Sequence, residues 1–181
     1  MSLVAAQEAL ARLVLDVPDF PEPGIVFKDI TPLLADPAGF AAVVDALADT
    51  GRDATGATRV DAVVGLEARG FVFAAPVALA LGVGFVPIRK AGKLPRAAHQ
   101  VSYSLEYGEA TLELHHDALA PGARVLVVDD VLATGGTLAA ARQLVEACGA
   151  EVSGVALLME LGFLDGRAAA GDLPLHPIVT I

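Results

Sequence analysis

Hydrophobic and polar positions along the chain follow two spacings, one typical of helices and one typical of buried strands. Apolar residues recur every three or four positions in residues 3–15 and 38–48, whereas residues 60–65 and 125–128 are nearly continuous apolar runs. Such runs of valine and leucine are typical of strands buried on both faces of a parallel sheet. The pattern therefore predicts an α/β protein with a mostly parallel central sheet flanked by helices.

The other segments continue this alternation. A loop is expected over residues 16–32. Further along, the pattern predicts a helix over 74–81, a turn at Gly82, a strand over 83–88, a charged loop, two strands at roughly 102–105 and 111–114, a helix over 138–148 that stops at Gly149, and a strand over 152–159. In a sheet of this kind, ligands bind at the carboxyl ends of the strands.

One apolar stretch has the length of a membrane span. Residues 71–88 carry no charge over 18 positions, which meets the minimum for a bilayer helix. Pro76, Gly82, Gly84 and Pro87 interrupt it, so a buried helix, a turn and a strand explain the same residues. We therefore expect no membrane association, and because the N-terminal segment lacks a signal-peptide layout, we expect a cytoplasmic protein.

Length and composition favour one acidic domain over residues 1–181. A chain of 181 residues can bury a sizeable core, and no linker, repeat or low-complexity tract divides it. Asp and Glu outnumber Lys and Arg by 22 to 12, for a net charge of −10, which argues against general binding to nucleic acid or anionic membranes. The single cysteine, Cys148, allows no intrachain disulfide.

The segment after residues 125–128 has the composition of an anion site. Two adjacent carboxylates, Asp129 and Asp130, follow the run, and we expect the strand to end at Asp129 because an unpaired charge in a dry interior is costly. The next five residues offer hydroxyls, open backbone N–H groups and glycines able to adopt positive φ. They are Ala133, Thr134, Gly135, Gly136 and Thr137. A helix begins there, and its N-terminus favours a phosphate. The segment predicts a ligand with both hydroxyls and a phosphate; a tight Gly-Gly turn with solvated aspartates is the alternative.

Two other segments carry charges suited to a polyanion. Four of the twelve basic residues fall within eight positions, at Arg89, Lys90, Lys93 and Arg96. Such a loop could fold over a polyanion, although a solvated basic loop explains it equally well. The turn after residues 60–65, which contains Arg69, could hold a second phosphate, or it is an ordinary β-to-α turn. The chain lacks the Gly-Lys-Ser/Thr phosphate loop and the Gly-x-Gly-x-x-Gly fingerprint, which weakens nucleoside triphosphatase and dinucleotide interpretations.

Glu106 is a candidate for proton transfer. It lies between Tyr103 and Tyr107, where partial desolvation could raise the pKa of its carboxyl group. An exposed glutamate in a hairpin is the simpler alternative.

Taken in order, these segments resemble the type I phosphoribosyltransferase family, which uses phosphoribosyl pyrophosphate (PRPP), and in particular its members that act on adenine. The most specific match is Val-Val-Asp-Asp-Val-Leu-Ala-Thr-Gly-Gly-Thr at residues 127–137. Further matching segments cover most of the chain, at residues 20–32, 65–71, 88–95, 103–108 and 160–167. The resemblance implies the type I phosphoribosyltransferase-like fold, with a small base-binding hood from about residues 1–35, a flexible catalytic loop at about 89–108, and a homodimer.

The resemblance also implies the site residues. Asp129 and Asp130 would meet the ribose hydroxyls, residues 133–137 would hold the 5′-phosphate, and Glu106 would be the catalytic acid or base, with Tyr107 in the same loop. Pyrophosphate would be held by Glu67, Ala68, Arg69, Arg89, Lys90 and Lys93. Adenine would be held by Val26, Phe27, Lys28 and Leu161. Ala91 and Ala98 depart from the family pattern, and they bear on the affinity of the loop rather than on the reaction.

The implied reaction is adenine plus PRPP giving AMP plus pyrophosphate, a step of purine salvage that passes through an oxocarbenium-like state. Mg²⁺ would be carried mainly by PRPP, with no direct protein site. Two alternatives stay open. One is a phosphoribosyltransferase for a 6-oxopurine such as xanthine or hypoxanthine. The other is a non-catalytic, PRPP-sensing regulator, for which we would expect a DNA-binding segment and a basic face.

Overall fold

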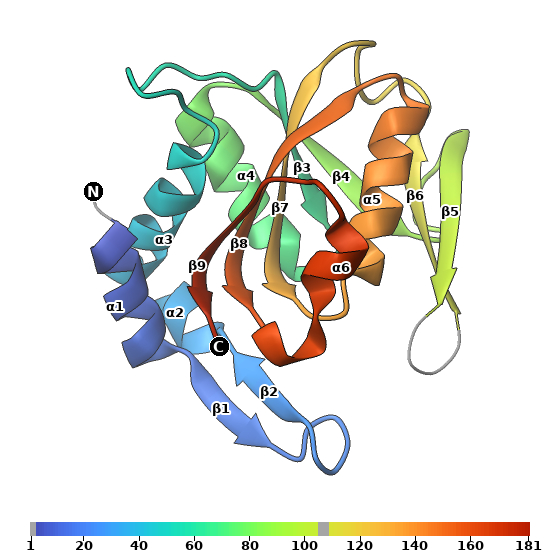
Figure 1. Cartoon of the computed structure of the whole chain (residues 1–181). Helices are drawn as coiled ribbons and strands as arrows, with labels where there is room; N and C mark the ends of the chain where they lie inside the picture. Colours follow the sequence, from blue (N-terminus) through green and yellow to red (C-terminus); the bar gives the residue numbers. More distant parts are fainter. Residues whose placement is uncertain (1–2, 105–108) are drawn as a thin grey trace. The chain divides into compact units, whose positions relative to one another are not determined.

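The computed structural model describes residues 3–104 and 109–181, which form two compact units, Met1–Ala46 and Leu47–Ile181. The single domain expected over residues 1–181 stays a prediction. Figure 1 shows the order of the elements along the chain. The first unit contains α1 (Leu3–Leu13), β1 (Leu15–Pro18), β2 (Val26–Asp29), α2 (Thr31–Ala35) and most of α3 (Pro37–Asp49).

The loop predicted over residues 16–32 is wrong. β1 and β2 pair in an antiparallel hairpin, and α2 begins at Thr31. The turn of the hairpin is held by Asp19, whose carboxylate accepts the backbone N–H of Gly24 at 2.8 Å. The rings of Phe20 and Phe27 meet edge to face at 5.2 Å. These contacts join residues on either side of a proline-rich turn, so the hydrophobic spacing does not reveal them.

In the described residues, the second unit is built on a seven-stranded sheet of order β5-β6-β4-β3-β7-β8-β9. The strands are β3 (Ala62–Leu66), β4 (Gly84–Lys90), β5 (Ala98–Ser104), β6 (Glu109–His115), β7 (Arg124–Leu132), β8 (Glu151–Glu160) and β9 (Leu175–Thr180). β4, β3, β7, β8 and β9 run parallel, and β5 and β6 are antiparallel. The mostly parallel sheet is confirmed. β9 was not predicted; it is the edge strand, where Pro177 is tolerated.

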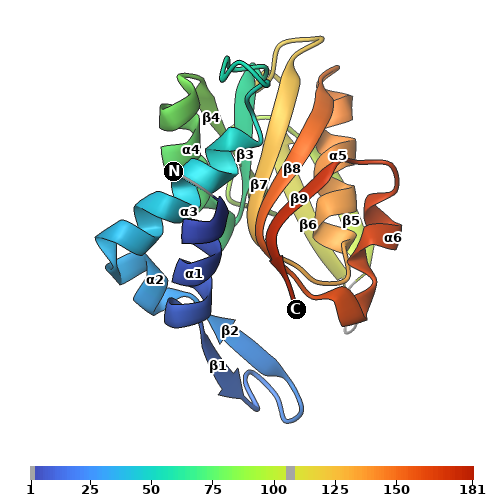
Figure 2. The same ribbon diagram turned by 60° about the vertical axis from the view of Figure 1, so that its left-hand side comes forward.

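Helices cover both faces of this sheet. α4 (Arg69–Leu81) packs on β3, β4 and β7, whereas α5 (Gly136–Ala147) packs on β5, β6 and β8, and Figure 2 shows them on opposite sides. The short η1 (Gly162–Leu164) and α6 (Gly166–Ala170) follow β8. α4 begins five residues before the predicted 74–81 and contains Pro76 in its interior. Its end at Gly82, with φ of 70°, is as predicted.

The apolar stretch over residues 71–88 contributes to α4 and β4. Across residues 3–104 and 109–181, every helix falls short of the length and apolar character that crossing a bilayer requires. The two strands predicted at 102–105 and 111–114 form the longer hairpin β5–β6, and the helix predicted at 138–148 is α5, followed by Gly149 with φ of 77°.

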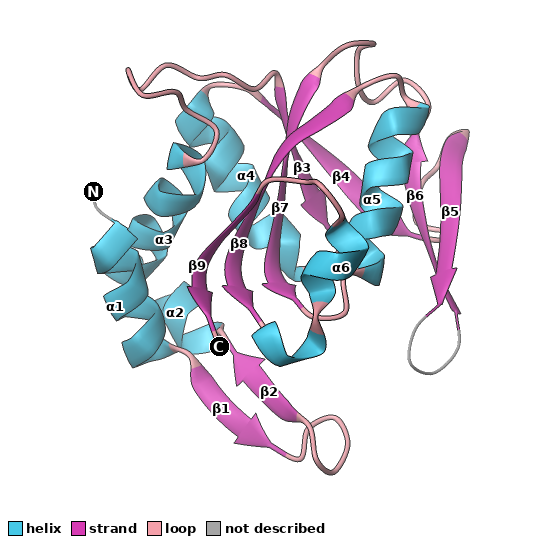
Figure 3. Cartoon of the chain, viewed as in Figure 1, coloured by secondary structure: helices cyan, strands magenta, loops and turns pink. Residues whose placement is uncertain are grey.

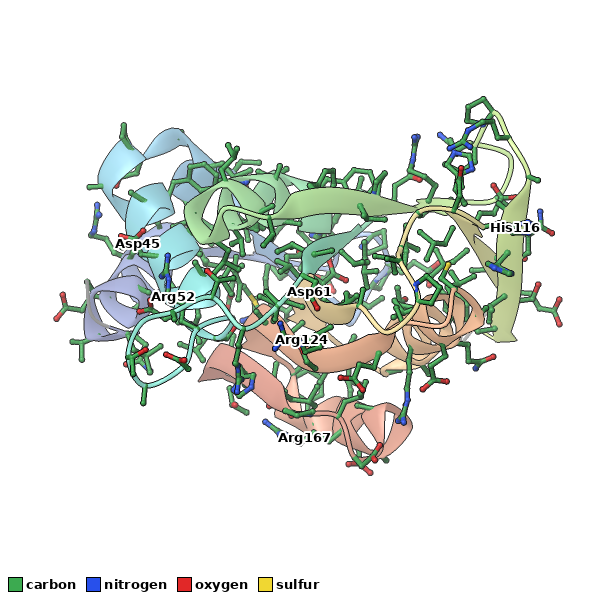
Figure 4. The ribbon with its side chains drawn as sticks, turned by 90° about the horizontal axis from the view of Figure 1, so that it is seen from above. Asp45, Arg52, Asp61, His116, Arg124 and Arg167 are labelled. Atoms are coloured by element: carbon green, nitrogen blue, oxygen red, sulfur yellow. The ribbon has the colours of Figure 1, made fainter. Side chains whose placement is uncertain are left out.

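The central strands β3 and β7 are held in register at their amino ends. The backbone N–H of Arg124 donates to Asp61 at 2.8 Å, and its guanidinium donates at 3.0 and 3.1 Å; Figure 4 shows the two side chains pointing toward one another. These hydrogen bonds lower the pKa of Asp61 to about 2. From this end, Ala62 pairs with Val125 and Gly65 with Val128. The carboxyl ends of the parallel strands therefore lie at one edge of the sheet, as their arrowheads in Figure 3 show.

The strand predicted to end at Asp129 continues to Leu132. Asp129 pairs with Leu157 of β8, and Leu132 pairs with Glu160. Asp130 is 4% exposed. The expectation was wrong because the charge is not alone: Oδ2 of Asp130 lies 2.8 Å from Nε of Arg69. A carboxylate with an ion-pair partner can remain inside the sheet, whereas an unpaired one would have to leave it.

Candidate functional site

The turn after β3 and the acidic end of β7 meet at the carboxyl ends of these two strands. β3 and β7 are direct neighbours, so the turn that follows Leu66 lies beside the acidic end of β7. Arg69 reaches Asp130 from this turn. Gly70 allows the close approach, because a Cβ atom there would lie 2.8 Å from both the Val128 carbonyl and an Asp129 carboxylate oxygen. The start of α4 and the acidic pair therefore form one continuous surface.

The acidic pair is electrostatically strained, with Asp130 buried and Asp129 partly exposed. Burial, followed by the neighbouring charge of Asp130, raises the pKa of Asp129 well above its usual range. The backbone N–H of Asp130 donates to Oδ1 of Asp129 at 2.9 Å. Oδ2 of Asp130 is near Arg69 but has no hydrogen-bond partner of good geometry among the described residues. Because a buried acceptor usually has a donor, this oxygen is suited to a ligand hydroxyl.

The loop after β7 has an open form that suits an anion. Residues 133–137 are called the anion cradle below. Gly135, with φ of 83°, turns the chain into α5, and in the described residues no side chain caps the N-terminus of that helix. Its first backbone N–H groups therefore point toward the loop without a side-chain acceptor, and the helix dipole favours an anion there. A pocket opens at this point between the loop and the sheet. It is lined by Leu66, Val127, Asp129, Val131, Leu132, Ala133, Thr134, Gly135, Thr137, Leu138, Val155 and Leu157.

The cradle is supported from behind by the backbone of α6. A Cβ atom on Gly135 would meet the carbonyl oxygen of Gly166 at 2.5 Å, and one on Gly166 would collide with the carbonyl oxygen of Ala133. The two main chains touch without intervening side chains. Gly166 was within a matching segment of the sequence, but its role in holding this loop was not predicted, because the contact joins residues far apart in the chain.

The residues predicted to hold pyrophosphate gather around Glu67. Its carboxylate accepts from Nε of Arg89 at 3.0 Å and from the backbone N–H of Lys90 at 2.8 Å, and Nζ of Lys93 lies 3.8 Å away. Burial would raise the pKa of Glu67, but these donors and charges outweigh it and lower the pKa. The resemblance implied that these residues hold pyrophosphate, and that role stays a prediction. The structure adds that the Glu67 side chain collects the cations. The Glu67–Ala68 peptide is cis.

A second buried carboxylate, Glu113 of β6, organises the start of the basic loop. It is 5% exposed and accepts the backbone N–H of Gly92 at 3.1 Å and the side-chain amide of Gln100 at 2.6 Å. Arg96 lies apart from this group, in an exposed ion pair with Asp117 at 2.7 Å. Glu113 had not been singled out from the sequence, since a glutamate on a polar-apolar alternating strand gives no signal of burial.

The residues predicted to hold the base lie in both units. Val26, Phe27 and Lys28 form β2 in the first unit, where Nζ of Lys28 is 2.6 Å from Asp16. Leu161 follows β8 in the second unit, and its backbone N–H donates to the carbonyl of Leu132 at 2.9 Å. Their joint role in one pocket stays a prediction. Glu106 and Tyr107 lie outside the described residues, so their roles also stay predictions.

Leu161 is flanked by an ion pair that the sequence did not reveal. The guanidinium of Arg167 donates to both carboxylate oxygens of Glu160, at 2.6 and 2.7 Å. Glu160 is 4% exposed. These hydrogen bonds lower the pKa of Glu160 despite its burial. This ion pair ties α6 to the end of β8. It thereby holds the segment between them, which includes Leu161, and it holds Gly166 behind the anion cradle.

Comparison with known proteins agrees with this geometry. The phosphoribosyl transferase domain model matches residues 29–173. An adenine phosphoribosyltransferase of Nocardioides sp. is 70% identical over 174 residues, which cover 96% of this chain and 94% of that protein. The crystal structure of adenine phosphoribosyltransferase from Rhodothermus marinus superposes with a TM-score of 0.90 at 46% identity and covers 98% of this chain and 99% of that one.

A third relative carries ligands. The adenine phosphoribosyltransferase of Saccharomyces cerevisiae, solved in complex with an imino-altritol bisphosphate and adenine, has a TM-score of 0.92 and 41% identity, with 98% of this chain and 99% of that chain covered. The similarity extends over nearly the whole sequence, so the type I phosphoribosyltransferase fold expected from the sequence is confirmed.

Asp129→Asn should stabilise the ligand-free protein at neutral pH. The raised pKa means that folding disfavours the charged carboxylate, so the wild type loses stability as pH rises through the ordinary carboxyl range toward the folded pKa. Asparagine keeps the acceptor for the Asp130 N–H and removes the charge. We expect a higher melting temperature at pH 8 and a smaller gain at pH 4. Asp130→Asn is the control, because it breaks the pair with Arg69. A lower melting temperature for Asp129→Asn at pH 8 would contradict the strain described above.

Gly166→Ala should displace the anion cradle. The new methyl group would overlap the Ala133 carbonyl, and overpacking of this kind costs about 1–3 kcal/mol of stability. Movement of the loop to relieve the overlap should weaken binding of a phosphate at residues 133–137. Calorimetric titration with ribose 5-phosphate measures the loss. Gly84→Ala is the matched control, because a Cβ there meets nothing within 4 Å. Equal affinities for the two variants would show that the loop does not depend on this contact.

Proposed function

Since the chain belongs to the phosphoribosyltransferase family, and within it to the adenine phosphoribosyltransferases, we propose that it converts adenine and PRPP into AMP and pyrophosphate, a reaction of purine salvage. The observation that carries this proposal is the meeting of an acidic pair, a helix N-terminus that no described side chain caps, and a cation cluster at one edge of the sheet. A ribose that bears a 5′-phosphate on one side and a diphosphate on the other matches these three parts.

Each part has a distinct role in the proposal. The N-terminus of α5 and residues 133–137 bind the 5′-phosphate, and Asp129 and Asp130 accept hydrogen bonds from the ribose hydroxyls. On the other side, Arg69 and the cations collected by Glu67 bind pyrophosphate. The cations are the side chains of Arg89 and Lys93. Glu67 also accepts the backbone N–H of Lys90. The substrate is thereby held at both ends, with the bond to be broken between them.

The acidic pair also suits the transition state. As the bond to pyrophosphate breaks, positive charge develops on the sugar ring, and fixed carboxylates stabilise it most effectively where water is excluded. Negative charge develops at the same time on the departing pyrophosphate, where the guanidinium and ammonium groups lie. Water has to be excluded because it would compete with adenine for the cation. The arrangement thus separates the two charges that the reaction creates.

The donor set fits Mg²⁺ that arrives mainly with PRPP. Among the described residues, no group of three or more His, Cys, Asp or Glu side chains could hold a metal by itself. Asp130 nevertheless presents a carboxylate oxygen without a hydrogen-bond partner in that part of the chain. Mg²⁺ is typically bound by one or two carboxylates together with substrate phosphates. When bound, it would neutralise charge on the diphosphate.

Adenine specificity rests on relatives of the same family. The Saccharomyces cerevisiae enzyme was solved with adenine, and we propose that Val26, Phe27, Lys28 and Leu161 form the corresponding pocket here. The side chain of Lys28 is already paired with Asp16, which leaves the β2 backbone as the group that reads the base edge. A homodimer and a cytoplasmic location are further expectations from the family.

Product formation by the purified protein tests the proposal directly. The protein is incubated with Mg²⁺, PRPP and, separately, adenine, hypoxanthine, guanine, xanthine and uracil, and nucleotide and pyrophosphate are quantified together. We expect AMP and pyrophosphate in equal amounts from adenine alone. Turnover of xanthine or hypoxanthine instead would retain the chemistry and change the base. PRPP binding without any turnover would replace the enzyme with a PRPP sensor.

Glu106→Gln should lower turnover with little change in PRPP affinity. We propose that Glu106 manages the proton of the purine ring during attack, and general acid or base catalysis of this kind typically contributes about 10²–10⁴-fold to a rate. Steady-state kinetics together with PRPP titration measure both quantities. Glu109→Gln is the matched control, since Glu109 is exposed at the start of β6. Unchanged turnover in the Glu106 variant would remove that residue from the catalytic role.

A further inference from the structure

A hydroxyl–hydroxyl hydrogen bond joins the β5–β6 hairpin to the anion cradle. The phenol oxygen of Tyr103, near the end of β5, lies 3.0 Å from Oγ1 of Thr137 in the first turn of α5. The ring of Tyr103 packs against the core of the second unit. Its hydroxyl is therefore held in a fixed place, because an aromatic side chain anchored by its ring has little freedom left at its tip.

The chemistry of a bound phosphate decides the direction of this hydrogen bond. Phosphate oxygens at the helix N-terminus only accept, so the one proton of the Thr137 hydroxyl has to point to the phosphate. Thr137 must then accept from Tyr103, and the Tyr103 hydroxyl is the donor. The two bonds form a chain in which each polarises the next. A phenol is a suitable first donor here, because its ring places it beside the cradle without adding a charge.

Thr137 also needs a partner to select its conformation. Thr137 lies in the first turn of α5, so its hydroxyl has no carbonyl of a preceding helical turn to bond to, and the backbone alone does not fix its direction. A fixed donor beside the hydroxyl favours one direction. We propose that Tyr103 is a positioning residue that orients the Thr137 hydroxyl toward the 5′-phosphate. This inference rests on the proposed function, since it assigns the N-terminus of α5 to the phosphate of a phosphoribosyl ligand.

A neighbouring pair of the same chemistry provides a control. Ser102 and Thr111 face one another across β5 and β6, with their hydroxyl oxygens 2.7 Å apart. Ser102 precedes Tyr103 in β5, and the Ser102–Thr111 pair joins β5 to β6 and is exposed. Because successive side chains of a strand point to opposite faces, Ser102 points away from the face on which Tyr103 meets α5. Loss of the Ser102 hydroxyl therefore reports what a hydroxyl pair contributes to the hairpin alone.

The experiment is a double-mutant cycle read by ribose 5-phosphate binding. The variants are Tyr103→Phe, Thr137→Val, the double variant and Ser102→Ala. Isothermal titration gives each dissociation constant, and thermal melting shows that each variant is folded. We expect Tyr103→Phe to weaken ribose 5-phosphate by about threefold to tenfold, the effect of one neutral hydrogen bond, and Ser102→Ala to leave it unchanged. The double variant should bind no more weakly than Thr137→Val, because without the hydroxyl Tyr103 has nothing to orient.

Kinetics separate a positioning role from a general structural one. With Tyr103→Phe, KM for PRPP should rise while KM for adenine stays at the wild-type value. An unchanged affinity for ribose 5-phosphate, an equal effect of Tyr103→Phe in the Thr137→Val background, or equal rises in both KM values would each overturn the inference. If the wild type forms no nucleotide but the binding cycle behaves as expected, the proposed reaction fails and the Tyr103–Thr137 assignment stands.

Discussion

The placement of two adjacent carboxylates near the end of β7, one buried and one partly exposed, is the constraint on which the rest of this site depends. Asp129 and Asp130 are costly where they are, and their neighbours each offset part of the cost. Arg69 supplies the opposite charge, the Asp130 N–H supplies a hydrogen bond, and β8 pairs the backbone through Leu132. The start of α4 therefore has to lie against β7, and only a glycine at position 70 allows that approach. The backbone course at the ends of β3 and β7 therefore follows from the need to accommodate the charge of Asp129 and Asp130.

The same principle, with the signs reversed, governs the cationic side. The positive charges of Arg89 and Lys93 would repel each other without a neighbouring carboxylate. Glu67 holds both side chains close before any ligand binds. Glu113 fixes the backbone between them through Gly92. In the function proposed above, an arriving diphosphate would find these partners assembled and would not have to bring them together. The cost would be competition, because the diphosphate would share those cations with Glu67.

The sequence predicted those features whose signal lies within a few residues. Continuous apolar runs predicted β3 and β7, glycines predicted the ends of α4 and α5, and the small residues after the acidic pair predicted the loop that leads into α5. Contacts between distant residues could not be predicted in this way. Glu67 meets Arg89 over 22 positions and Tyr103 meets Thr137 over 34. Burial of Glu113 and continuation of β7 past Asp129 also depend on packing partners that no local pattern specifies.

The contact between the cradle and α6 has a consequence for how the protein can change over time. Where two side chains touch, a larger residue on one side can be matched by a smaller one on the other, and the pair can drift together. At Gly135 and Gly166 the touching groups are main chains. A backbone carbonyl cannot be made smaller by substitution, so a second substitution at the partner position does not relieve the overlap caused by the first. Glycine should therefore be retained at both positions, whereas positions in the surrounding sheet and helices, where side chains touch, can change in compensating pairs.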